Sequence, residues 1–456
     1  MKMNTNRIHS IWALTWPQCL MLLCQCVIGL TDVWAGGRLG ADVQASIGLI
    51  TQCNMMFMAL AMAAANGAVA SISQSFGAKK ERRARRYIWL VLFGTVALGV
   101  LIAAAASLWR EPILRLIQTP EAIMPVAIMF LTATIWGIPG QYVLTIGGAI
   151  FRSAQMVRLP LLITAAAGLF NVFGDLAFGL GWWGFPAYGA AGIAYSTLIS
   201  VSFGAAVMLM LMVHRGLLAQ TAFPPLQWIK AGSGYLLKVA MPALGTSFLW
   251  QTGYMILYVI TASLPFERVN ALAGLTTGIR VESILFLPAV AFGMTASVLV
   301  GHALGEGNRQ EAKRTLLATF GIACVIMSLV GAVIWPWRLE LASLITPDPA
   351  VQIQTVNYLS YNILAVPFTV TSIVLAGGLN GAGATVYPMI IFSMAIWLIR
   401  LPIAWLFGHI LWQDAAGVYL SIFISQVAMS LSLLWITLRC NWTRFALNAH
   451  PHSASR

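Results

Sequence analysis

Long apolar runs recur along the whole chain and are separated by short polar segments. A helix needs about 20 apolar residues to cross the hydrocarbon core of a bilayer. On that criterion the sequence predicts twelve transmembrane helices, at about residues 11–35, 46–72, 88–109, 124–147, 159–181, 187–213, 238–262, 271–300, 315–337, 352–376, 386–408 and 416–438. The many short alternating segments of a membrane β-barrel are absent from the sequence. The pattern therefore indicates an all-α integral membrane protein.

Composition supports this class, and the positions of the charges predict its orientation. Of the 456 residues, 59% are hydrophobic and only 9% are charged, against about 25% charged in a soluble domain. With the N-terminus placed in the cytoplasm, 19 Lys and Arg residues fall in cytoplasmic segments and five in external loops. This asymmetry follows the positive-inside rule. The net charge of +13 therefore orients the chain in its membrane, and we expect no nucleic-acid partner.

The two halves of the sequence repeat each other with a nearly constant offset. Matching pairs are Pro17 and Pro242, Ser71 and Ser297, and Pro160 and Pro388. Six spans per half give both copies the same orientation, an arrangement typical of transporters that rock around a central site. We therefore predict an N-lobe at 1–215, a cytoplasmic linker at 216–237 marked by Pro-Pro and Gly-Ser-Gly, a C-lobe at 238–438 and a loose cytoplasmic tail at 439–456.

Three polar residues stand out inside the predicted spans of the N-lobe. Asp32 lies in the first apolar run, and Asn171 and Asp175 lie four residues apart in the fifth. Residues four apart on a helix share one face. An ionised carboxylate at bilayer depth costs roughly 2.5–3.5 kcal/mol on insertion scales, and such residues often mark an ion or proton path.

The repeat provides an internal comparison for the two acids. Asp32 aligns with about Leu257 or Tyr258 in the second half, and Asp175 aligns with about Ile403. A packing requirement shared by both lobes therefore does not explain the acids. One interpretation is a coupling site, in which a proton or Na⁺ relieves desolvation and mutual repulsion of the carboxylates. The other is a structural pair satisfied by Asn171 and nearby hydroxyl groups. The lack of Lys or Arg in the spans of that lobe favours the coupling site.

The remaining charges inside spans are Arg280, Glu282 and Arg400, all in the C-lobe. Arg280 and Glu282 are two residues apart and do not face each other on one helix. Arg400 is a candidate ion-pair partner for Glu282. The three residues either form a structural ion pair or act in proton relay or substrate contact, and the sequence favours the structural role.

No enzyme constellation is present in the sequence. The six His residues lie in loops, at span ends or in the tail, and no nucleotide-binding glycine loop of the Walker type occurs. The six Cys residues lack zinc-ligand spacing and are interpreted as small packing residues. We therefore expect no enzymatic activity, no cofactor and no bound metal apart from a coupling ion.

Motifs along nearly the whole chain resemble those of the multidrug and toxin extrusion (MATE) family. The residues that carry the resemblance are Pro17 through Asp32, Gly36-Gly-Arg-Leu-Gly40, Phe151-Arg152-Ser-Ala with Pro160, Asn171-x3-Asp175, Gly184 through Ala194 with Thr197, Arg280-x-Glu282 with Pro288, Gly301-x2-Leu-Gly-Glu-Gly-Asn308, and Leu379-Asn-Gly-Ala-Gly383. Their order and spacing together carry more weight than any one motif.

The resemblance implies a V-shaped fold of two six-helix lobes and an antiporter that exports cationic or amphipathic organic molecules in exchange for H⁺ or Na⁺. It assigns Asp32, Asn171, Asp175 and Thr197 to the cation or proton site, and Pro17 to bending of the first span. Thr197 has the alternative of bonding only to its own helix backbone.

In the second lobe the chain departs from sodium-coupled members of that family. Gln251 lies near a position where some of them have Glu, and Ala384 falls where they have Asp. This departure favours coupling in the N-lobe and leaves Gln251, Arg280, Glu282 and Arg400 as a second polar site of open role.

The resemblance also implies a monomer in the inner membrane of a bacterium, with both termini cytoplasmic and with membrane lipids as neighbours. The alternative function is a flippase for a lipid-linked precursor, with a related two-lobe architecture. It ranks lower because a pyrophosphate cargo needs a cationic cavity, and the spans hold only two Arg residues, both in the C-lobe.

Overall fold

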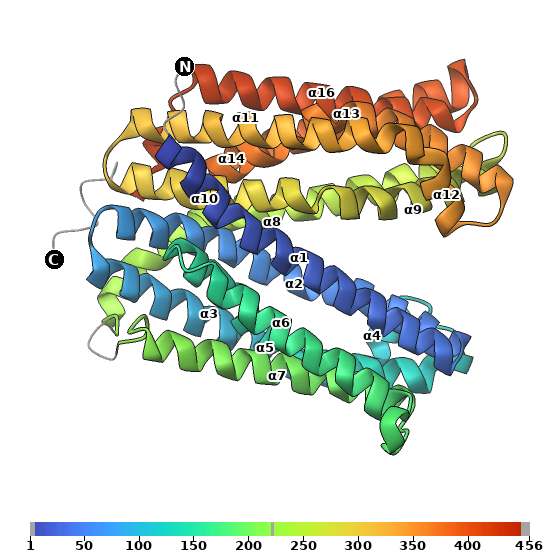
Figure 1. Cartoon of the computed structure of the whole chain (residues 1–456), viewed down its shortest axis with the longest axis horizontal. Helices are drawn as coiled ribbons and strands as arrows, with labels where there is room; N and C mark the ends of the chain where they lie inside the picture. Colours follow the sequence, from blue (N-terminus) through green and yellow to red (C-terminus); the bar gives the residue numbers. More distant parts are fainter. Residues whose placement is uncertain (1–4, 220–222, 448–456) are drawn as a thin grey trace. The chain divides into compact units, whose positions relative to one another are not determined.

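A computed structural model describes residues 5–219 and 223–447 of the chain, and almost all of the regular structure is helical (Figure 1). The main α-helices are α1 (Thr5–Leu39), α2 (Ala41–Gly77), α3 (Glu81–Leu108), α4 (Arg110–Leu116), α5 (Met124–Ser153), α6 (Arg158–Gly174), α7 (Ala190–His214), α8 (Leu226–Ala262), α9 (Arg268–Leu285), α10 (Leu287–Gly305), α11 (Arg309–Ile334), α12 (Arg338–Ile345), α13 (Pro349–Gly381), α14 (Val386–Met394), α15 (Leu401–Trp405) and α16 (Ala415–Arg439). Short 3₁₀ turns are η1 (Glu121–Ile123), η3 (Trp182–Gly184), η5 (Trp335–Trp337) and η8 (Trp442–Phe445), and π-helical segments are η2 (Asp175–Gly179), η6 (Ala395–Arg400) and η7 (Leu406–Leu411).

Eleven helical segments in the described part of the chain are long and apolar enough to cross a membrane. They overlap eleven of the twelve predicted spans, so the protein is an all-α, multi-pass membrane protein. The eighth predicted span, 271–300, is divided between α9 and α10 in the structure. The remaining predicted span, the seventh at 238–262, lies in α8 (Leu226–Ala262), a helix of 37 residues. In α8, Gly, Ser, Thr and Gln residues alternate with the apolar ones and lower its hydropathy.

The helix contacts repeat between the two halves as the sequence offsets predict. The fourth predicted span, α5, packs against α2, α3 and α7, which are the second, third and sixth spans. The tenth span, α13, packs against α10, α11 and α16, which are the eighth, ninth and twelfth. Each half therefore has its fourth helix at its centre, surrounded by the same neighbours.

The chain divides into two compact units, and two helices contribute to both. One unit contains the described residues before Leu20 together with those from Lys238 onward, and the other contains Leu20–Leu237. The division falls inside α1, just after Pro17, and inside α8, just before Pro242. Proline inside a helix removes one backbone hydrogen bond. The two repeat-related prolines thus lie where each helix passes from one unit to the other.

The second half of the segment predicted as a linker is helical, which its Pro-Pro and Gly-Ser-Gly motifs did not indicate. Helix α8 begins at Leu226, directly after Pro224-Pro225, and continues through Gly232-Ser-Gly234. Packing explains why the glycines do not interrupt it. The ring of Trp228 covers Gly232, and the backbone of Leu236 approaches Gly67 of α2. Tertiary packing overrides the low helix propensity of glycine here.

The prediction of a loose tail after Arg439 is wrong for its first residues. Trp442 is 1% exposed and belongs to a hydrophobic core with Leu433 and Ile436 of α16. Its indole Nε1 donates a hydrogen bond of 3.2 Å to the carbonyl oxygen of Thr437. Residues 448–456 of the predicted tail lie outside the described residues.

An ion pair fixes the beginning of α1 within its unit. The guanidinium of Arg7 donates to both carboxylate oxygens of Glu311, at 2.8 Å and 3.0 Å from Nη2. Further along α1, Thr15 and Gln18 both hydrogen-bond to the Thr295 hydroxyl of α10. These contacts place the first turns of α1 against α10 and α11.

We expect Arg7→Gln to lower the stability of the protein modestly. The two side chains are 19% and 33% exposed, so solvent screening limits the loss to about 1 kcal/mol. Thermal unfolding in detergent measures it, and the exposed pair Glu81–Arg85 within α3 provides the control, because Arg85→Gln should cost less than about 0.5 kcal/mol. The charge-swapped double variant Arg7→Glu with Glu311→Arg should recover part of the loss, and a swap that recovers nothing would exclude the ion pair as the cause.

Candidate functional site

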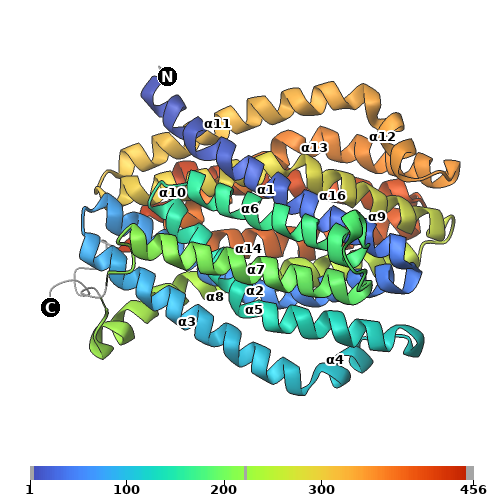
Figure 2. The same ribbon diagram turned by 60° about the horizontal axis from the view of Figure 1, so that its bottom comes forward.

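The fifth predicted span changes its helical geometry at Asp175. Helix α6 (Arg158–Gly174) ends there and continues as the π-helix η2 (Asp175–Gly179). Helix α7 lies alongside α6 in both views (Figures 1 and 2). π-Helical turns are rare in proteins overall, but those that occur are often found at functional sites. The sequence predicts one continuous helix here, because apolar periodicity does not reveal a single wider turn.

Asn171 and Asp175 both face α7, as their spacing predicted. They are 2% and 0% exposed. The hydroxyl of Ser196 donates to the Asp175 carboxylate. The Asn171 amide Nδ2 donates to the Thr197 hydroxyl at 3.1 Å, and that hydroxyl donates in turn to the carbonyl oxygen of Ile193 at 3.1 Å. Thr197 therefore bonds to its own helix and also holds Asn171.

Glycines allow this close approach of α7 to η2. A β-carbon on Gly192 would lie 2.2 Å from the carbonyl oxygen of Phe178, and one on Gly174 would lie 2.5 Å from the Cβ of Ser196. Neither distance is compatible with a larger side chain unless the backbone moves. These two glycines therefore set the distance at which Ser196 reaches Asp175.

Asp32 on α1 completes the group. Its carboxyl lies within hydrogen-bonding range of the Asp175 carboxyl and interacts with it electrostatically. Both residues belong to the unit Leu20–Leu237. Two acids from the first and fifth spans, far apart in the sequence, thus meet inside one bundle, as the coupling-site hypothesis requires.

Three buried oxygens in this group lack a hydrogen-bond donor among the residues that the structure describes. They are Asp32 Oδ1, Asn171 Oδ1 and Asp175 Oδ2. A carboxylate only accepts hydrogen bonds, so two facing carboxylates need a proton or cation between them. The ion pairs within the described ranges are Arg7–Glu311 and Glu81–Arg85, and neither brings a basic side chain to these acids. By their chemistry, the carboxyl pair suits H⁺, and carboxylate and amide oxygens suit a hard cation such as Na⁺.

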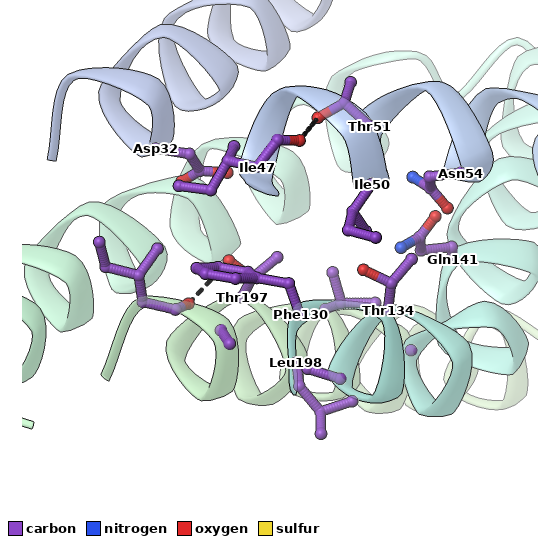
Figure 3. Close-up of a pocket in the computed structure, with 15 residues that line it drawn as sticks. Asp32, Ile47, Ile50, Thr51, Asn54, Phe130, Thr134, Gln141, Thr197 and Leu198 are labelled. Carbon is purple, nitrogen blue, oxygen red and sulfur yellow. Dashed lines mark hydrogen bonds between the residues drawn. The ribbon is translucent and has the colours of Figure 1, made fainter. Parts of the chain in front are cut away.

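A cavity of about 120 Å³ adjoins Asp32 and Thr197. Its other polar lining residues are Thr51 and Asn54 of α2 and Thr134 and Gln141 of α5. In Figure 3, Asn54 and Gln141 lie close together at one end of the cavity, away from Asp32. Apolar lining comes from residues such as Ile47, Ile50 and Phe130.

Sequence reasoning missed Ser196 and these four polar residues. A signal for the four was present, since Thr51 and Asn54 are three apart and Thr134 and Gln141 are seven apart. Both spacings place the pair on one helix face. Nothing in the sequence showed that the two faces meet. Ser196 carried no signal, because a serine in a packed membrane helix is common.

The second polar site is brought together only in part, since Glu282 and Arg400 interact electrostatically but share no hydrogen bond. Gln251 and Arg280 are exposed, whereas Arg400 is 0% exposed. The hydroxyl of Tyr358 donates to the Glu282 carboxylate, and Arg400 Nε donates to Ser425 Oγ at 2.8 Å. No ion pair within 4.0 Å joins Arg400 to Glu282 in the described chain. The two residues therefore have separate hydrogen-bond partners.

Comparisons with known proteins agree with the fold and its duplication. The MatE family model matches residues 17–176 and 242–406, once in each half of the chain. The chain is 26% identical over 428 residues to the probable multidrug resistance protein NorM of Thermotoga maritima, covering 93% of this chain and 90% of that protein. A protein of the same description from Synechocystis is 26% identical over 431 residues, with 91% and 90% covered.

Solved structures show the same architecture. An outward-facing multidrug resistance MATE family transporter of the MOP superfamily superposes with a TM-score of 0.87 at 21% identity, covering 95% of this chain and 96% of that one. At this level of identity the likeness concerns the fold.

Proposed function

Since this chain belongs to the MATE family of membrane transporters and is not an enzyme, we propose that it is a secondary active antiporter that exports cationic or amphipathic organic compounds in exchange for H⁺ or Na⁺. The observation that carries the proposal is the contact between Asp32 and Asp175, with donor-free oxygens at each carboxyl. An unpaired acid pair inside a membrane bundle is costly, and ionisable residues kept there despite this cost mark ion paths.

Binding of a proton or Na⁺ at the pair changes the force between α1 and η2. Without the ion the carboxylates repel each other, and with it they are bridged. Helix α1 carries Asp32 in one unit and begins in the other unit, with Pro17 just before the division. Ion binding at Asp32 therefore acts on a helix that links both units, and a bend at Pro17 couples it to reorientation. Exchange of the ion for the drug follows if the two orientations of the protein differ in their affinity for the ion and in their affinity for the drug.

The cavity beside Asp32 has a volume of about 120 Å³, so it accommodates only part of a drug-sized compound. It is the proposed place where the coupling ion competes with a cationic group of that compound. Its carboxylate attracts a cationic compound, and Asn54 and Gln141 offer hydrogen bonds. Protonation of Asp32 removes that attraction and so releases the compound. A cavity lined by an acid does not suit a pyrophosphate, because both are negatively charged. We therefore rank the lipid-precursor flippase below the antiporter.

Transport by the purified protein in liposomes tests the function. A cationic dye is loaded, and its movement is followed under an imposed pH gradient alone and under an imposed Na⁺ gradient alone. Dye movement coupled to either gradient supports the antiporter and identifies the ion, whereas movement of a lipid-linked pyrophosphate without dye transport would support the flippase. Orientation with both termini cytoplasmic is tested separately by labelling introduced terminal cysteines.

Asn171 distinguishes the two coupling ions. Its Oδ1 is a ligand for Na⁺ but is too weak a base to hold a proton, so Asn171→Leu should affect the two mechanisms differently. If Na⁺ drives transport, the Na⁺ concentration for half-maximal transport should rise by at least about tenfold, since one of three oxygen ligands is lost. If H⁺ drives transport, dye efflux under a pH gradient should fall by less than about threefold. A loss of the same size under both gradients would contradict a ligand role for Asn171.

A further inference from the structure

A buried arginine with unused donors lies in the unit that contains Lys238 and the chain after it. Arg400 ends the π-helix η6 and is 0% exposed. Its Nε donates to Ser425 Oγ on α16 at 2.8 Å. Neither Nη1 nor Nη2 has a hydrogen-bond partner among the described residues. A guanidinium has five N–H donors, so four of them are unsatisfied in a buried setting.

The acid nearby forms no ion pair with this arginine within 4.0 Å in the described chain. Glu282 interacts with Arg400 electrostatically, but its carboxylate takes the hydrogen bond from Tyr358. The ring of Tyr358 packs directly over Gly278, where a β-carbon would lie 2.2 Å from it. Tyr358 is therefore held in place, and it keeps the Glu282 carboxylate on its own hydroxyl. Buried cations are usually paired, and Arg400 departs from that rule.

Two aromatic rings of α8 cover the guanidinium. The Cζ of Arg400 lies 5.6 Å from the ring centroid of Trp250 and 5.2 Å from that of Tyr254. These contacts stabilise the positive charge, and the Tyr254 hydroxyl also interacts with the guanidinium electrostatically. Neither side chain makes a hydrogen bond of good geometry to Nη1 or Nη2. Both residues are themselves only partly buried. This cover consists of side chains from one helix.

The internal repeat relates this arrangement to the acid pair of the other unit. Arg400 stands close to the repeat counterpart of Asp175, and Ser425 stands close to that of Ser196. In each unit a serine of the sixth span bonds to the charged residue of the fifth span, beside a π-helical segment. The same scaffold thus presents two acids in one unit and an arginine under aromatic rings in the other.

We propose that Arg400 binds an oxyanion group, a carboxylate or a phosphate, of an aromatic solute whose ring stacks on Trp250 and Tyr254. The planar fork of the guanidinium offers two parallel donors at its Nη groups, which match the two oxygens of such an anion. This rests on the proposed transport function and deepens it, because it adds zwitterionic and anionic aromatic compounds to the cationic substrates expected from the acid pair.

Binding of matched dyes to the purified full-length protein tests the assignment without any ion gradient. The probes are a rhodamine with a free carboxylate and the methyl ester of the same dye, followed by fluorescence anisotropy. Arg400→Gln should weaken binding of the carboxylate dye by at least about tenfold, since it removes a charged hydrogen-bonding partner, and binding of the ester by less than about twofold. Equal loss for both dyes, or no loss for either, would overturn the proposal.

A second pair of probes separates the two oxyanions. Flavin mononucleotide and riboflavin differ by a phosphate. In the pair that carries the preferred anion, wild type should bind the anionic member more tightly, and Arg400→Gln should lose this preference. If wild type distinguishes the members of neither pair, Arg400 is not an oxyanion site.

Variants control for damage to the fold. Arg338→Gln is the matched control, because Arg338 also stacks on a tryptophan, at 4.5 Å from the Trp335 ring. This substitution should change the binding of neither dye. If Arg400→Gln does not purify as a single species, Arg400→Lys and Ser425→Ala test the proposal instead. Each should weaken binding of the carboxylate dye more than binding of its ester. Failure of the transport function is distinguishable: wild-type liposomes would then move neither dye under any gradient.

Discussion

Replacing Asp175 with asparagine is expected to abolish ion-coupled dye efflux while leaving the protein folded. The carboxamide keeps an oxygen to accept the hydrogen bond from Ser196, but it neither takes up a proton nor carries the charge that binds a cation. Transport driven by the coupling gradient should fall by at least about tenfold, because the bound ion no longer distinguishes the two orientations. Initial rates in liposomes measure the loss. Asp42→Asn is the control, since Asp42 is an exposed acid in the first turn of α2, and it should transport normally.

The stability of the same variant separates the coupling site from a purely structural pair. If the two acids exist for ion binding, removing one charge relieves repulsion and desolvation. The unfolding temperature in detergent should then rise without Na⁺ at an alkaline pH at which the pair holds no proton. If the pair instead holds the bundle together, Asp175→Asn should lower the unfolding temperature. A destabilised variant that still transports at the wild-type rate would refute the coupling role.

Gly192→Ala is expected to damage both stability and coupling, although it adds a single methyl group. That methyl would lie 2.2 Å from the carbonyl oxygen of Phe178, so the backbone of η2 must shift. Overpacking of this kind costs about 1–3 kcal/mol, and the shift carries Asp175 away from Ser196 and Asp32. We expect a clearly lower unfolding temperature and at least about tenfold slower coupled transport, since small displacements at a binding site are costly.

Gly94 provides the matched control for this substitution. It lies in α3, where a β-carbon would meet no atom within 4 Å, and alanine favours a helix over glycine by about 1 kcal/mol. Gly94→Ala should therefore be neutral or slightly stabilising, with normal transport. If Gly192→Ala behaved like Gly94→Ala, the close approach of α7 to η2 would not determine the geometry of the site.

Much of the fold was predictable because membranes restrict how a chain satisfies its backbone. Apolar runs of about 20 residues must be helices where lipid supplies no hydrogen-bond partners. The constant repeat offset then predicted two similar halves, which the neighbours of α5 and α13 and the double match of the family model confirm. The sequence did not indicate that the predicted linker is helical from Leu226 onward, where packing against α2 and α3 keeps the segment helical despite its glycines.

The site was predictable in part for the same reason. Asp32 and Asp175 are conspicuous because they are acids in apolar runs. Asn171 is four residues from Asp175, which placed both on the same face of one helix. Charged residues are costly in lipid, so the sequence alone marks them as unusual. The functional residues missed, Ser196 and the cavity residues Asn54 and Gln141, are small or neutral and carry no such cost.

The sequence by itself therefore determined the class of the protein, the positions of most of its spans, its duplication and the identity of its rare intramembrane charges. Only the tertiary structure decided which of them meet. It brings Asp32 to Asp175, and it pairs Glu282 with Tyr358 and Arg400 with Ser425, although the sequence offered Arg400 as a partner for Glu282. The physical reason is that helix periodicity assigns each side chain to a face of its own helix, whereas contacts between faces depend on the rotation and approach of neighbouring helices, set here by glycines and by π-helical turns.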